Sequence, residues 1–149
     1  MPAAKTALVL GAGIGSMVYV LRKQGYDPKV TIVEMDKVIL RMAMELFEGM
    51  EPQPQIAPVC MDARLYMAQN TAKFDLIFLD VFNGRVVPDF VTSQEFLLRC
   101  RSAVESGGHL AFNYMINDNG EWEKVKQNFA AVFPEYKELN LGINRVLIV

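Results

Sequence analysis

Three glycines at a single junction in the chain are the first residues whose type and spacing could do chemistry. Gly11, Gly13 and Gly15 lie between an apolar run, residues 7–10, and a helical pattern over residues 15–24. Glycines there let the backbone turn tightly and let a ligand approach the main chain without meeting a Cβ. The helix that follows offers free N–H groups and the positive end of its dipole. The junction therefore predicts a ligand-binding loop, and a tight connection that binds nothing is the alternative.

An acidic residue follows this loop at the distance that adenosine recognition requires. Glu34 ends the next apolar run, residues 29–33, about 20 residues beyond the glycines, where its carboxylate can accept both hydroxyls of a ribose. The spacing of the glycines is GxGxG, and the sixth position of the dinucleotide fingerprint GxGxxG is Ser16. An adenosine-containing cofactor is thus predicted, and a dinucleotide such as NAD is disfavoured.

Two aspartates follow later apolar runs. Asp62 precedes a helical pattern over residues 63–70 and is expected to cap it, since its carboxylate can accept from an N–H of the first turn. Asp80 ends the run 74–79, and open α/β sheets bind ligands beyond the carboxyl ends of their strands. Asp80 could act as a base or orient a substrate or an amino group, or it could cap nearby N–H groups.

The elements that position these residues alternate between strand and helix along the whole chain. Apolar β runs alternate with helical patterns, and the fifth strand is followed by a helix and then by two short β runs. The β runs are 7–10, 29–33, 56–60, 74–79, 109–114, 136–141 and 144–149, and the helices are 15–24, about 38–47, 63–70, 93–104 and 121–133. This order predicts a mostly parallel sheet with helices on both faces. The last two strands are too close for a crossover helix, so one of them must be antiparallel. Pro58 suggests that the third strand lies at a sheet edge, and residues 106–108 read as a turn. No linker divides residues 1–149, so one domain is expected.

The motifs in this order resemble the class I S-adenosylmethionine-dependent methyltransferase superfamily, and within it spermidine synthases and their methyltransferase-like relatives. The segments that carry the resemblance are residues 8–16, 31–36, 61–64, 74–80, 92–96 and 106–108. The resemblance implies a Rossmann-like methyltransferase fold with a seven-stranded sheet and an antiparallel last strand. It also implies a site for S-adenosylmethionine or S-adenosylhomocysteine. The residues it assigns to that site are Gly11, Ala12, Gly13 and Gly15 for the methionine and ribose portion, Glu34 for the ribose, Met35 for the adenine ring, Asp62 with Ala63 for the adenine amino group, and Asp80.

The stretch after the fourth strand departs from the spermidine synthase pattern. Those enzymes are expected to carry two aspartates three residues apart, with proline after the second, to hold the amine substrate and help remove its proton. Here Asp80 matches the first, Asn83 replaces the second and Gly84 replaces the proline. An amide cannot accept a proton near neutral pH or balance an ammonium charge. Residues 1–149 also contain no counterpart of the amino-terminal β-hairpin domain of that family, so aminopropyl transfer is disfavoured.

Composition excludes several other classes. A net charge of −2 with scattered Lys and Arg argues against nucleic acid or anionic lipid as a partner. The two cysteines, Cys60 and Cys100, fit no CxxC pattern, and His109 has no second histidine near it, so neither a disulfide framework nor a metal site is expected. No signal peptide or membrane span is apparent, and a cytoplasmic location is predicted.

The leading functional hypothesis is an S-adenosylmethionine-dependent methyltransferase with Asp80 as its catalytic or orienting residue. Methyl transfer asks mainly for alignment of a nucleophile with the sulfonium methyl group. A non-catalytic binding or assembly protein of the same fold is the main alternative, followed by an aminopropyltransferase and an NAD-binding domain. The methyl acceptor is a small molecule or a protein, and Tyr114, Asn117 and Asp118 are candidates to touch it. A second copy or a partner protein is expected to cover the cleft.

Overall fold

The computed structural model describes residues 4–13 and 15–149, apart from the side chain of Asn119. Ile14, in the middle of the glycine loop, lies outside the described residues. The strands are β1 (Thr6–Leu10), β2 (Lys29–Glu34), β3 (Ile56–Cys60), β4 (Phe74–Leu79), β5 (Val104–Met115), β6 (Lys137–Leu141) and β7 (Asn144–Ile148). The helices are α1 (Ser16–Lys23), α2 (Lys37–Glu48), α3 (Ala63–Gln69), α4 (Gln94–Ala103) and α5 (Asn119–Val132), with a 3₁₀ turn at Asp89–Thr92.

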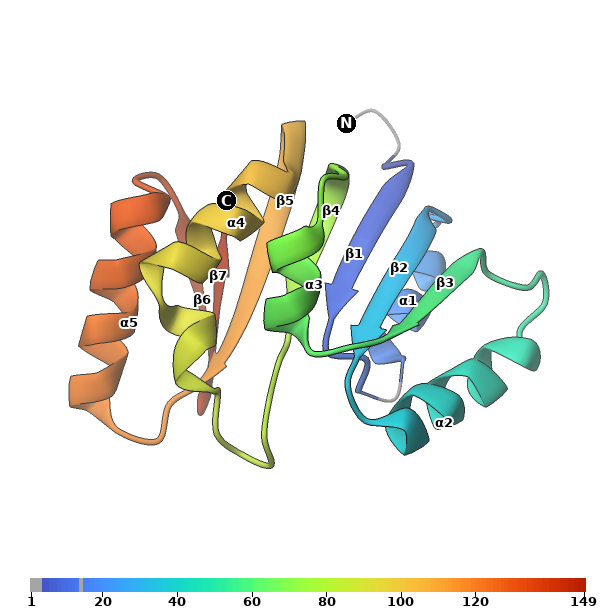
Figure 1. Ribbon diagram of the computed structural model, residues 1–149, viewed down its shortest axis with the longest axis horizontal. Coiled ribbons are helices and arrows are strands. Elements are labelled where there is room, and N and C mark those ends of the chain that lie inside the picture. The colour runs from blue at the N-terminus through green and yellow to red at the C-terminus, as the bar shows by residue number, and fades with distance from the viewer. Residues whose placement is uncertain (1–3, 14) are drawn as a thin grey trace.

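The seven strands form one sheet in the order β3-β2-β1-β4-β5-β7-β6. Strands β1 to β5 are parallel, and β7 is antiparallel to both of its neighbours, β5 and β6. The predicted mostly parallel sheet with an antiparallel last strand is therefore confirmed, as is the position of β3 at a sheet edge. Because the parallel strands all end on the same side of the sheet, the loops after β1, β2, β3, β4 and β5 gather there, at the lower side of Figure 1.

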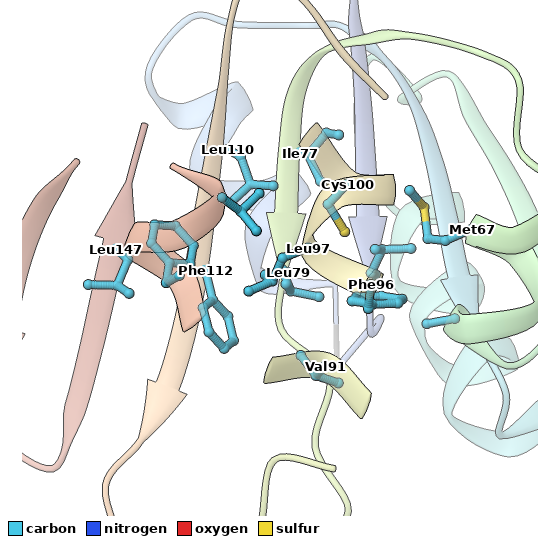
Figure 2. Close-up of a cluster of buried hydrophobic side chains, with 14 of the residues drawn as sticks. Met67, Ile77, Leu79, Val91, Phe96, Leu97, Cys100, Leu110, Phe112 and Leu147 are labelled. Carbon is cyan, nitrogen blue, oxygen red and sulfur yellow. The ribbon is translucent and has the colours of Figure 1, made fainter. Parts of the chain in front are cut away.

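Helices cover both faces of the sheet, as predicted. On one face α1 and α2 bury Val18, Leu40, Ala43 and Phe47 against β1 and β2. On the other face, toward the viewer in Figure 1, α3, α4 and α5 pack over β4 and β5. Figure 2 shows side chains from β4, β5, α4 and α3 pointing toward one another, among them Ile77, Leu79, Leu110, Phe112, Phe96, Leu97, Cys100 and Met67. This apolar layer holds the carboxyl ends of β4 and β5 in a fixed position.

The turn predicted at residues 106–108 is wrong, because these residues lie inside the long strand β5. The pairing of β5 with β4 shifts register between Phe74 and Leu76, because Phe74 pairs with Val104 and Leu76 with His109, and both pairs are parallel; the stretch is thus an irregularity within the strand. Gly108 allows β5 to lie close to β4, since a Cβ there would come within 2.8 Å of the carbonyl oxygen of Asp75. Two adjacent glycines suggest a turn in sequence, and only the strand partner shows that the chain stays in β5 here, through an irregular stretch in which Gly107 has a φ of +76°.

Part of the sheet face on the α1 side is only thinly covered. The residues of β5 that point away from α4 and α5, such as His109 and Ala111, remain partly exposed. On the neighbouring edge, Leu139 and Leu141 of β6 are 45% and 62% exposed. A cavity of about 460 Å³ lies at the amino ends of β4 and β5 against α1, with Leu21, Leu76 and Phe78 in its wall. None of its lining residues belongs to the predicted cofactor site, which is at the opposite ends of the strands.

Candidate functional site

The three glycines of the first loop all have positive φ angles, but only one of them leaves open space. A Cβ on Gly11 would overlap the carbonyl oxygen of Asp80 and lie 2.8 Å from its carbonyl carbon. A Cβ on Gly15 would lie 2.5 Å from Cζ of Phe47 in α2. Around Gly13 no atom lies within 4 Å of the corresponding position. Packing thus requires Gly11 and Gly15, whereas Gly13 presents bare backbone to the outside.

Glu34 faces the glycine loop from the end of β2. Its Oε2 accepts a hydrogen bond from the N–H of Ala12 at 3.1 Å, and its Oε1 accepts from the N–H of Asp36 at 2.9 Å. Gly11 is held beside it, because its N–H donates to the carbonyl of Val33 at 2.9 Å. A carboxylate has about four acceptor positions, so two remain after these two bonds. Glu34 therefore has the orientation and the spare capacity to accept two hydroxyl groups at the loop.

Met35 is exposed beside this carboxylate. Its side chain is 68% exposed, although the neighbouring Val33 is buried. Asp36 directly after it caps α2 by accepting from the N–H groups of Val38 and Ile39, which fixes the backbone on the far side. An apolar side chain held in water at this point is suited to packing on a flat apolar ring.

Asp62 caps α3, as predicted. Its Oδ1 accepts from the N–H of Arg64 at 2.7 Å, and Ala63 beside it is buried. The end of β3 lies next to β2, since the N–H of Met61 donates to the carbonyl of Glu34 at 3.1 Å. The guanidinium of Arg64 lies 3.9 Å from Oδ2 of Asp62, and because the Arg64 side chain is largely exposed this long ion pair contributes little. The second carboxylate oxygen is thus still accessible to a ligand donor.

Asp80 lies against the glycine loop. Its N–H donates to the carbonyl of Leu10 at 2.9 Å, and its own carbonyl is the group that Gly11 accommodates. Its side chain is held from β5, because Nδ2 of Asn113 donates to Oδ1 of Asp80 at 2.8 Å. The structure therefore brings together Asp80 and the loop residues, as the sequence predicted.

Asn113 was not among the residues predicted for the site. A signal was present, since Asn113 is a polar residue near the carboxyl end of a strand whose alternate residues Leu110 and Phe112 are buried. The three residues predicted as candidates to touch the methyl acceptor each have a partner within the fold. Tyr114 stacks on Trp122 with 5.3 Å between ring centroids, Asn117 donates to the carbonyl of Arg85, and Asp118 caps α5.

Neither a metal cluster nor a membrane helix is found in the described part of the chain. No group of three or more His, Cys, Asp or Glu side chains there could hold a metal ion. Among the helices of residues 4–13 and 15–149, none has the length and hydropathy needed to cross a membrane.

The geometry of the loop, Glu34 and Asp80 can be compared with known proteins. The spermine/spermidine synthase domain matches residues 1–142, nearly the whole chain. The chain belongs to this family.

Named relatives of the chain include both aminopropyltransferases and a methyltransferase. A polyamine aminopropyltransferase from Vibrio vulnificus is 27% identical over 99% of this chain and 50% of its own length. An N-terminal histidine N-methyltransferase from Emericella nidulans is 32% identical over 75% of this chain and 20% of its own length. The chain thus spans half or less of these proteins.

Solved structures of both kinds share the fold. Human methyltransferase-like protein 13, determined in complex with SAH, aligns with a TM-score of 0.82 at 22% identity, covering 97% of this chain and 70% of that one. Spermidine synthase from Thermotoga maritima aligns with a TM-score of 0.73 at 18% identity, covering 99% and 53%. The class I methyltransferase-like fold is therefore established for this member of the family.

Asn83, the residue at which a second aspartate was expected from the spermidine synthase pattern, lies in a surface turn. Asn83 and Val86 exchange two backbone hydrogen bonds, of 2.8 and 3.1 Å, around Gly84 with a φ of +61°. The side chain of Asn83 is exposed. An amide at this position adds no negative charge next to Asp80.

Proposed function

We propose that this chain binds S-adenosylmethionine at the carboxyl ends of β1 and β2 and transfers its methyl group to a nucleophile on a small molecule or a protein. The observation that carries the proposal is the Glu34 carboxylate, held on the glycine loop by the N–H of Ala12 with acceptor positions to spare. When bound, the sulfonium of the cofactor supplies an activated methyl group and its own leaving group.

The residues present fit such a ligand. Glu34 would accept the ribose hydroxyls, and the exposed backbone at Gly13 would allow the ligand to approach the loop. Met35 would pack on the adenine ring, and the second oxygen of Asp62, next to Ala63, would accept from the adenine amino group. The rest of the loop, Gly11, Ala12 and Gly15, would hold its shape.

Asp80 would serve as the carboxylate beside the reacting group. Its position against Gly11 places it between the loop and β5. It would orient the substrate or remove one proton, which is sufficient for methyl transfer to an amine or a hydroxyl.

A second candidate is aminopropyl transfer, which the names of the polyamine aminopropyltransferase relatives favour. The retained Asp80 supports it, and Asn83 argues against it because the second acid is missing. A non-catalytic protein that keeps the site is the remaining alternative.

Calorimetric titration with S-adenosylmethionine, S-adenosylhomocysteine, decarboxylated S-adenosylmethionine and NAD tests the proposal. Binding of the first two, with weaker binding of the decarboxylated form and no binding of NAD, is the expected result. Preference for the decarboxylated form would favour aminopropyl transfer. Absence of binding to any of the four would overturn the proposal and leave a scaffold role.

We also propose that a second copy or a partner protein covers the site, and that nucleic acid and membrane are not partners. The exposed apolar residues of β6 support association of this kind. Sedimentation at working concentration tests the first of these proposals, and a strictly monomeric chain without a partner would contradict it.

A further inference from the structure

The side-chain amide of Asn113 is hydrogen-bonded at its nitrogen but not at its oxygen. Its Nδ2 donates to Oδ1 of Asp80 at 2.8 Å, while its own Oδ1 is buried and has no hydrogen-bond partner in the part of the chain that the structure describes. A buried carbonyl without a donor costs free energy that a hydrophobic residue would not. The orientation of the amide is fixed, because an ionised carboxylate only accepts and so requires the NH₂ group to face it.

Asp80 in turn is oriented without being neutralised. Among residues 4–13 and 15–149 it has no ion-pair partner, and its Oδ2 accepts no hydrogen bond from them. A neutral amide on Oδ1 holds the carboxylate in one rotamer but leaves its full negative charge. A carboxylate of this kind is suited to bind a cation with N–H groups, which would donate a hydrogen bond to Oδ2.

We infer that Asn113 is a positioning residue that sets Asp80 to bind an ammonium group of the ligand next to the glycine loop. The inference rests on the proposed function, because it needs an adenosine-containing ligand at that loop. It extends that function by assigning the ammonium end of the ligand to the Asp80–Asn113 pair. The observation that carries it is the single hydrogen bond of the Asn113 side chain, which goes to Oδ1 of Asp80 and leaves Oδ2 for a ligand donor.

Three ligands separate this role from a structural one. S-adenosylhomocysteine and its decarboxylated form, S-adenosyl-3-thiopropylamine, both carry an ammonium group, whereas 5′-methylthioadenosine carries none. In Asn113→Leu we expect both ammonium ligands to bind about tenfold more weakly, the lower end of what a lost hydrogen bond to a charged group costs. We expect the affinity for 5′-methylthioadenosine to change by less than about twofold, because that ligand does not reach Asp80.

Asn144→Leu is a matched control. Asn144 also has a buried Oδ1 without a partner, and it lies on β7 opposite Met115, two residues along β5 from Asn113. It has no hydrogen bond to Asp80, so its replacement should change none of the three affinities. Both leucine variants should change the melting temperature little, because each removes an unsatisfied buried oxygen, and in Asn113→Leu this gain offsets the lost part-buried hydrogen bond to Asp80.

The variant Asp80→Asn completes the experiment. It should weaken the same two ligands, and adding Asn113→Leu to it should have no further effect, since Asn113 acts through Asp80. A lower melting temperature in Asn113→Leu with equal losses for all three ligands would overturn the inference in favour of a structural role. Unchanged affinities for all three would also overturn it, while leaving the proposed function intact. If the original protein binds none of the three, both fail together.

Discussion

Replacement of Glu34 by alanine is the perturbation that most directly tests the site. The change removes a carboxylate that accepts from the N–H of Ala12 at 3.1 Å and from the N–H of Asp36 at 2.9 Å. Both bonds are at least partly accessible to water, which can replace the lost acceptor. We therefore expect a small loss of stability, about 1 kcal/mol, or about 2–4 °C in melting temperature for a domain of this size.

The effect on ligand binding should be larger than the effect on stability. Two ribose hydroxyls would lose a charged acceptor, and removal of such a partner costs about 1–3 kcal/mol in total. The dissociation constant for S-adenosylhomocysteine should therefore rise by about 5- to 150-fold. Isothermal titration calorimetry on the folded variant measures this, with circular dichroism to confirm that the fold is retained.

Two comparisons locate the loss at the ribose. Glu48→Ala removes an exposed carboxylate from the last residue of α2, and it should leave the affinity unchanged. A ligand without the ribose hydroxyls should bind equally to the original protein and to Glu34→Ala, because the interaction is then absent in both. If Glu34→Ala binds S-adenosylhomocysteine as tightly as the original protein does, Glu34 is not part of the site and the argument from its orientation is refuted.

Three further predictions concern the glycine loop, the two cysteine thiols and Asp75 near the amino end of β4. Gly11→Ala should lower the free energy of unfolding by about 2–5 kcal/mol, because the new Cβ would overlap the backbone of Asp80 and the φ of Gly11 is +92°. Gly13→Ala should lower it by only about 1–2 kcal/mol, because only its positive φ is unfavourable. Urea unfolding measures both losses, and equal losses would contradict the packing argument. Burial raises the pKa of Cys100 to about 12, whereas Cys60 is exposed. A disulfide reagent at pH 8 should therefore modify one thiol per folded chain and two after unfolding. Rapid modification of both thiols in the folded chain would refute the burial of Cys100. The backbone N–H groups at the start of β1 lower the pKa of Asp75, so its stabilisation is present above about pH 4, the unfolded value, and is lost as the pH falls through the lower folded value. The stability difference between the original protein and Asp75→Asn should therefore shrink on acidification below about pH 4, and a constant difference in acid titrations of unfolding would show that the carboxylate is not involved.

Most elements of the fold were predictable because their signals are local. The apolar runs of β1, β2 and β4, and the cap at Asp62, depend on residues within one turn or strand. The antiparallel end of the sheet was also predictable, since the chain between β6 and β7 is too short for a crossover. The turn expected at residues 106–108 was wrong because adjacent glycines occur both in turns and in irregular stretches of a strand, and only the pairing with β4 distinguishes the two.

Within the site, the sequence by itself determined the residue types: a glycine-rich β1–α1 junction, an acid ending β2 and an acid ending β4. Tertiary structure decided what each residue contacts. It showed that Gly11 and Gly15 are required by contacts with Asp80 and Phe47, and that Glu34 reaches back to Ala12. It also paired Asp80 with Asn113, 33 residues further along the chain. The physical reason is that spacing along one strand or helix follows from backbone geometry, whereas contacts between strands depend on the order in which the whole sheet assembles.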